Sequence, residues 1–144
     1  MDESFARLWF SGFGEGLESL DSQSREALLA PCAGRCADSC PVGLYEKAWA
    51  GAGGDIGRFF SLLGQAPGID TKEGEPGKSW HIIYPACGCD LVAGGYAATP
   101  ALCECSRLSI SYCLRRALPY GFTVTKEKTI LQGDGCCRFL VELR

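Results

Sequence analysis

Trp80-His81-Ile82-Ile83-Tyr84 marks the point where the chain changes from helix-forming to strand-forming sequence. Aromatic and β-branched residues dominate this stretch, which favours a β-strand. Before it, up to about residue 65, apolar side chains recur at helical spacing, and after it, from about residue 79 to 144, the pattern indicates a strand, a helix and a hairpin. We therefore expect a single α+β domain over residues 1–144, with a helical N-terminal half packed on a small antiparallel sheet.

Glycine and proline divide the helical half into short predicted helices. Gly12, Gly14 and Gly16 should end the first helix, and Pro31 should interrupt the second. Residues 64–79 are rich in Gly, Pro and charge, which predicts an exposed connection. The helices are expected over residues 4–10, 22–30, 41–50 and 56–63.

The last part of the chain has clear start and stop signals. Thr99 caps free amides and Pro100 suits the first helical position, so a helix is expected from here to about Leu118. Strands are predicted over residues 122–131 and 136–144, joined by a turn at 132–135. On the final strand, one face should carry Cys137, Phe139, Val141 and Leu143.

The composition excludes several classes of protein. The net charge is −3, charged residues make up 22%, and there is no basic run, so we expect no nucleic-acid partner. No apolar run approaches the ~20 residues that span a bilayer, and Met1-Asp2-Glu3-Ser4 does not resemble a signal peptide. The expected protein has no membrane association and is cytoplasmic.

Ten cysteines and a single histidine define the chemistry that the chain could support. In a reducing compartment cysteines act as metal ligands, reactive thiols or small buried residues more often than as disulfides. A secreted, disulfide-bonded protein is the alternative, and the missing export signal argues against it. Because His81 is the single imidazole, a metal would be held mainly by sulfur, as zinc or an iron–sulfur cluster would be.

Two Cys-x-Cys pairs, Cys87/Cys89 and Cys103/Cys105, form the densest group of candidate ligands. On an extended chain Cys87 and Cys89 share a face, and His81 has the same parity. Cys105 lies near a helix N-terminus, which stabilises a thiolate. The predicted metal ligands are Cys87, Cys89, Cys105 and His81, with Cys103, Cys36 and Cys40 as secondary candidates, and the candidate catalytic residues are Cys105 and His81.

Geometry limits what each cysteine group can do. Cys103 and Cys105 are about 200° apart around an α-helix, so both can reach one centre only if the first turn is irregular. If the turn is regular, Cys103 faces the core and Cys105 alone faces the candidate site. Cys32, Cys36 and Cys40 would line one face of a continuous helix, which favours a cysteine-lined core face over a zinc site. All of the Cys-x-Cys thiols could instead simply fill tight turns.

The C-terminal motifs resemble those of known families. Cys103-x-Cys105-Ser106 begins the helix, and Gly133-Asp134-x-x-Cys137-Arg138-Phe139 forms the closing hairpin. Over residues 84–143 this is similar to a family of uncharacterised, cysteine-rich bacterial proteins and, more distantly, to the 4-vinyl reductase domain and to L-2-amino-thiazoline-4-carboxylic acid hydrolase. The resemblance implies a helix-lined cavity beside an antiparallel sheet, in a sensory or accessory module that binds small apolar molecules or metals through cysteines matching Cys103 or Cys105, and Cys137.

These observations favour a small-molecule-binding or sensory domain with a cysteine thiolate site, which could also hold a metal. One alternative is a hydrolase of a small cyclic amide or thiazoline that uses a cysteine or a metal-activated water. Another is a structural or dimerisation module, and the expected assemblies include a homodimer.

Overall fold

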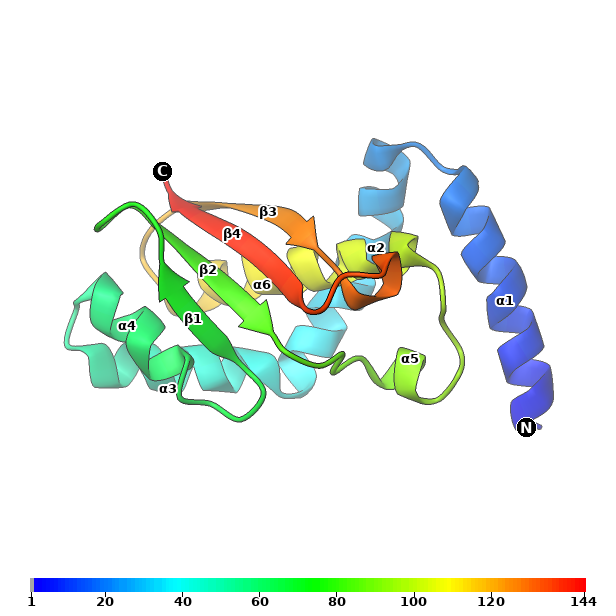
Figure 1. Ribbon diagram of the computed structural model, residues 1–144, viewed down its shortest axis with the longest axis horizontal. Helices are drawn as coiled ribbons and strands as arrows, with labels where there is room; N and C mark the ends of the chain where they lie inside the picture. The colour runs from blue at the N-terminus through cyan, green and yellow to red at the C-terminus, as the bar shows by residue number, and fades with distance from the viewer. Residues whose placement is uncertain (1) are drawn as a thin grey trace.

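Four strands pair into one antiparallel sheet in the order β1-β2-β4-β3, and six α-helices accompany it (Figure 1). This arrangement belongs to a computed structural model that describes residues 2–144. The α+β class and the helical N-terminal half are as expected. The elements are α1 (Glu3–Ser19), α2 (Ser22–Ser39), α3 (Pro41–Ala52), α4 (Ile56–Leu63), β1 (Asp70–Glu73), β2 (Ser79–Tyr84), α5 (Asp90–Ala93), the 3-10 helix η1 (Pro100–Cys103), α6 (Glu104–Ala117), β3 (Phe122–Lys128), the 3-10 helix η2 (Ile130–Gln132) and β4 (Cys137–Leu143).

The sheet is apolar on the face that the helices cover. β4 lies between β2 and β3, and Ile82 of β2 is paired with Phe139 of β4. Ile82, Phe139 and Val141 are fully buried, because alternate residues of a strand point to the same face. Figure 1 shows α2, α3 and α6 behind the sheet, which places the main core between these helices and the strands.

Helix α4 joins the helical layer to the sheet through aromatic side chains. Asp55 caps this helix by accepting a hydrogen bond from the Arg58 amide at 3.2 Å. Phe60 then stacks on Trp80 of β2, with ring centroids 4.5 Å apart and planes 12° apart. The contact ties the helical half to the strand where the sequence changes character. No helix within residues 2–144 is both long and apolar enough to cross a membrane.

Two predicted helix ends were wrong because tertiary packing overrides local propensity. α1 continues through Gly12, Gly14 and Gly16 to Ser19, although each interior glycine costs a helix about 1 kcal/mol. Leu17 is fully buried in a small core with Leu29 of α2, and this contact holds the last turns of α1 in place. α2 likewise runs through Pro31 as far as Ser39.

The predicted exposed connection over residues 64–79 contains a strand that the sequence did not reveal. β1 is the charged stretch Asp70-Thr71-Lys72-Glu73, and it pairs antiparallel with β2. It is an edge strand, where charged side chains reach solvent and also discourage pairing with other chains. Its pairing comes from the neighbouring strand rather than from its own side chains.

In the C-terminal part of the chain, the observed elements differ only slightly from the predicted ones. The helix expected to begin at Thr99 has the predicted extent, but Pro100–Cys103 is 3-10 rather than α-helical. The strand expected to reach Leu131 ends at Lys128, and η2 follows it. At the predicted turn, Gly133 adopts φ 99°, a conformation that glycine adopts most readily, and φ is not positive at Gly135.

Candidate functional site

A cavity of about 870 Å³ opens between α1, α2, the start of α6 and one end of the sheet. Phe10, Phe13 and Leu17 line it from α1, and Leu29 lines it from α2. Residues 84–100, which connect β2 to η1, supply much of the remaining wall. In Figure 1, α1 stands at the end of the molecule beside α5 and the loop that follows it. The cavity is thus enclosed by segments distant in sequence.

Most of the cysteines gather on the wall of this cavity. Two come from α2, two from the loop before α5, two from η1 and the start of α6, one from the middle of α6 and one from β4. Cys40 and Cys136 are the two that do not line it. The lining cysteines are Cys32, Cys36, Cys87, Cys89, Cys103, Cys105, Cys113 and Cys137.

The turn between η1 and α6 brings Cys103 and Cys105 to the same cavity. Cys103 is the last residue of the 3-10 helix, and Cys105 is the second residue of α6. The chain therefore changes helical pitch between the two residues, and the 200° separation of a regular α-helix does not apply. Both thiols line the cavity, so the expectation that Cys103 faces the core while Cys105 alone is presented was wrong.

Burial favours the neutral form of five of the eight cavity thiols. Burial, and then the neighbouring thiols of Cys36, Cys32, Cys89 and Cys103, raise the pKa of Cys105 to about 12. The expected thiolate at Cys105 is therefore not favoured, because desolvation outweighs the effect of the helix N-terminus. Burial also raises the pKa values of the other partly enclosed thiols, namely Cys36, Cys103, Cys113 and Cys137.

These shifts predict a loss of stability at alkaline pH. A thiol whose pKa is raised on folding stabilises the protein below its ordinary pKa of 9.0, and this contribution disappears as the pH rises towards the folded-state value of about 12. The free energy of unfolding, measured in urea, should therefore fall between about pH 9 and pH 11, and Cys105→Ala or Cys113→Ala should reduce that fall. Cys40→Ala, at an exposed position, is the matched control and should leave the pH dependence unchanged. An identical pH profile for all three variants would contradict the prediction.

The structure separates His81 from the predicted cysteine ligands. Cys87, Cys89 and Cys105 line the cavity, but His81 does not, because β2 ends at Tyr84 and the strand parity is lost before Cys87. The His81 Nε2 atom lies 3.2 Å from Glu127 Oε1 on β3. Hence His81 is not placed to act as a base for Cys105. Among residues 2–144, no group of three or more Cys, His, Asp or Glu side chains is arranged to hold a metal ion.

The secondary ligand candidates are divided by the end of α2. Cys32 and Cys36, four residues apart, both line the cavity, as their spacing on one helix face requires. Cys40 follows the end of the helix at Ser39 and leaves that face. All three residues are exposed rather than packed in the core, so the prediction of a core face was wrong.

Sequence reasoning missed the contribution of α1 to this site. Its inner face carries Phe10 and Phe13, and Arg7 donates a hydrogen bond to the Gly94 carbonyl at 2.9 Å, linking α1 to the end of α5. The outer face leaves Leu8 and Trp9 exposed, at 75% and 57%. The sequence does contain a signal for this contribution, because apolar residues occur on two sides of this helix. The homodimer stays a prediction.

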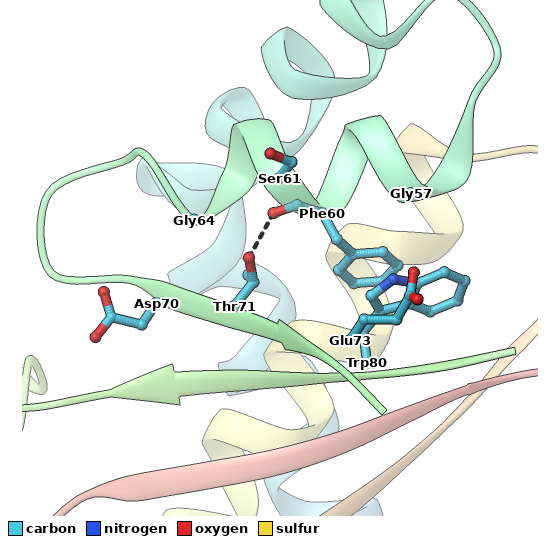
Figure 2. Close-up of a pocket in the computed structure, with 8 residues that line it drawn as sticks. All are labelled: Gly57, Phe60, Ser61, Gly64, Asp70, Thr71, Glu73 and Trp80. Carbon is cyan, nitrogen blue, oxygen red and sulfur yellow. Dashed lines mark hydrogen bonds between the residues drawn. The ribbon is translucent and has the colours of Figure 1, made fainter. Parts of the chain in front are cut away.

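A smaller hollow of about 540 Å³ lies between α4 and the edge of the sheet (Figure 2). Figure 2 shows the Asp70 and Glu73 carboxylates of β1 on its rim, and the Thr71 hydroxyl donating a hydrogen bond to the Phe60 carbonyl at 2.6 Å. Both carboxylates are exposed, and no thiol or imidazole lines this hollow. It therefore offers less chemistry than the thiol-lined cavity.

Comparison with known proteins gives a limited result. No family model matches the chain, and no curated protein matches it. A solved structure with a similar arrangement is that of trafficking protein particle complex subunit 3 from Naegleria fowleri covalently bound to palmitic acid. The two chains are 11% identical, the TM-score is 0.49, and the alignment covers 99% of this chain and 97% of that one.

Proposed function

We propose that this protein is a small-molecule-binding domain of a sensory or accessory kind, and that its ligand is a largely apolar molecule held in the thiol-lined cavity. The cavity itself carries the proposal. Its volume of about 870 Å³ falls within the range of roughly 300–1,000 Å³ typical of small-molecule sites, and such sites are mostly apolar. The resemblance of residues 84–143 to the 4-vinyl reductase domain points in the same direction.

The neutral thiol of Cys105 suits this role. A protonated cysteine behaves as a small, polarisable apolar side chain, and burial keeps the Cys105 thiol protonated at neutral pH. Zinc or an iron–sulfur cluster at Cys87, Cys89 and Cys105 is the alternative content of the cavity. A metal requires deprotonated thiols, which the burial of Cys105 opposes. The hydrolase alternative has Cys105 on the cavity wall but lacks His81 beside it.

Binding of a neutral dye provides a direct test. Nile red should bind saturably with a rise in fluorescence, and decane should displace it, because the cavity wall is mainly apolar. Bound decane should also slow the labelling of Cys36 by iodoacetamide, while Cys40, outside the cavity, labels at an unchanged rate. Both rates are measured by peptide mass spectrometry.

The opposite results are equally clear. Dye binding that does not saturate, with no protection of Cys36, would contradict a ligand cavity. Stoichiometric zinc or iron in protein purified without chelators, lost in a Cys89→Ser/Cys105→Ser variant, would instead support the metal alternative.

A further inference from the structure

An apolar stripe runs along the outer face of α1. Phe5, Leu8 and Trp9 are 57%, 75% and 57% exposed, and they supply half of the six large apolar side chains that are exposed among residues 2–144. In Figure 1, α1 forms one end of the molecule, and no other described element lies on its far side. Residues at spacings of three and four share one side of an α-helix, so three small residues continue the same line. We call this set of exposed residues the outer stripe: Phe5, Leu8, Trp9, Gly12, Gly16 and Ser19.

The two glycines of the outer stripe have no role in packing within residues 2–144. An interior glycine costs a helix about 1 kcal/mol relative to alanine, and a Cβ atom added at Gly12 or Gly16 would meet nothing within 4 Å. Gly14 differs, because a Cβ atom there would lie 3.3 Å from Thr99 Cγ2. Small residues on a helix surface let a second helix approach closely. The outer stripe therefore has the form of a helix-packing surface whose partner is not among residues 2–144.

The outer stripe is complementary in shape to a second copy of itself. Its bulky residues all precede Gly12, and its small residues lie at Gly12 and after it. If two copies of α1 cross antiparallel at Gly12, Leu8 of one copy lies opposite Gly16 of the other, because both are four residues from the crossing. Phe5 lies opposite Ser19 for the same reason. A parallel pair would instead place bulky side chains against bulky ones, whereas a two-fold axis at the crossing produces the antiparallel pair.

The charges of α1 favour a protein partner over a membrane surface. The outer stripe contains no charged residue, so covering it would bury no unpaired charge. Helices that bind membrane surfaces are rich in Lys and Arg on their polar face. The polar face of α1 has one basic residue, Arg7, and three acidic ones, Glu3, Glu15 and Glu18. An anionic lipid surface would therefore repel it.

The area of the outer stripe suits weak, reversible association. Its exposed apolar side chains amount to roughly 400 Å² per copy, taking about 150–250 Å² for a whole large side chain. Apolar patches of this size on a single chain are often functional. Two copies would bury about 1,000 Å² in total once the polar rim is included, which is the size of weak or transient interfaces.

We infer that the outer stripe is the contact between two copies of this protein, which associate reversibly through an antiparallel crossing of their α1 helices at Gly12. Trp9 is the anchor of this contact. Its ring stacks on Phe13 of the same helix, with centroids 6.0 Å apart and planes 13° apart, which holds it in position before association. The contact does not depend on the proposed ligand, because Phe10 and Leu17 line the cavity from a different side of α1.

Sedimentation velocity tests this contact in the wild-type protein. Between about 2 and 200 μM it should show a reversible equilibrium between monomer and dimer, with monomer at the lowest concentrations because the contact is small. Leu8→Glu should weaken the dimer at least about tenfold, since it places a charge in the contact. Leu28→Glu makes the same change at an exposed leucine of α2, so it is the matched control and should leave the equilibrium unchanged.

Gly12→Leu distinguishes a close helix crossing from an apolar patch that associates without specific packing. It adds apolar surface, so an unspecific patch would associate more strongly, whereas the crossing should weaken at least about tenfold. The single copy should stay folded, as circular dichroism would show, because the new side chain projects into open space. Gly43→Leu is the matched control, since Gly43 is an exposed glycine of α3 whose added Cβ atom also meets nothing within 4 Å.

A pair of opposite charges tests the orientation of the crossing. Leu8→Lys and Gly16→Glu should each weaken the dimer, and the double variant should associate at least about threefold more tightly than either single variant, because the antiparallel crossing places the two new charges side by side. A double variant no tighter than the single ones would overturn the antiparallel crossing.

Three results would overturn the contact itself. One is a protein that stays monomeric up to about 200 μM, a concentration at which even weak interfaces of this size are populated. Another is a dimer that Leu8→Glu and Gly12→Leu leave unchanged. The third is flotation of the monomer with phosphatidylcholine–phosphatidylserine vesicles that Leu8→Glu abolishes, which would assign the outer stripe to a membrane surface.

Discussion

Phe60→Ala should lower the free energy of unfolding by about 3–5 kcal/mol, the usual cost of truncating a buried phenylalanine. Phe60 is 1% exposed and lies between Trp80 of β2 and Phe122 of β3, with ring centroids 4.5 Å and 6.3 Å away. Its removal would leave a void where α4 meets the sheet, because neighbouring rings cannot fill the space without moving the backbone.

Urea unfolding followed by circular dichroism measures this loss. Phe5→Ala is the matched control, because Phe5 is 57% exposed on α1 and should change stability by less than about 0.5 kcal/mol. Equal effects of the two substitutions would mean that Phe60 does not join the helical layer to the sheet in the way described.

Cys105→Phe should weaken binding of Nile red and decane at least about tenfold. Cys105 lines the cavity near the start of α6, and an aromatic ring at this position would occupy the space that the ligand needs. The substitution should change stability by less than about 3 kcal/mol, because the added ring can extend into the cavity instead of straining a packed core. The chain should therefore remain folded while it loses its ligand.

Cys40→Phe provides the matched control for this experiment. It makes the same chemical change at an exposed cysteine outside the cavity, so affinity for both ligands should be unchanged. Equal affinities in the two variants would place the ligand somewhere other than this cavity. Thermal unfolding of each variant shows whether a loss of binding reflects a loss of fold.

The sequence predicted most of the regular elements, because their signals are local. Thr99 caps the amide of Ala101 with its hydroxyl at 3.2 Å, and the helix start follows from that cap and from Pro100. The alternation placed Phe139 and Val141 on one face of the last strand, because side chains of a strand point alternately to its two faces, and the structure buries both residues. Such patterns depend only on residues a few positions apart.

The elements that were missed depend on contacts between distant residues. β1 is a strand because β2 lies beside it, and its four residues are polar or charged. α1 continues beyond its glycines because Leu17 packs against Leu29 of the next helix. Patterns of neighbouring residues cannot predict these contacts, since the partner residues come from other elements.

The sequence by itself determined the α+β class, the N-terminal position of the helices and the concentration of chemistry in the cysteines. The tertiary structure decided that eight of the ten cysteines share one cavity, that His81 lies outside it and that Tyr45 and Tyr84 form part of its wall. It also decided the state of the thiols, because a pKa depends on burial and neighbouring groups, which arise only when the chain has folded. Trp80-His81-Ile82-Ile83-Tyr84 shows this division. Its side chains predict a strand, and only the fold turns Trp80 to α4 and Tyr84 to the cavity while leaving His81 beside Glu127.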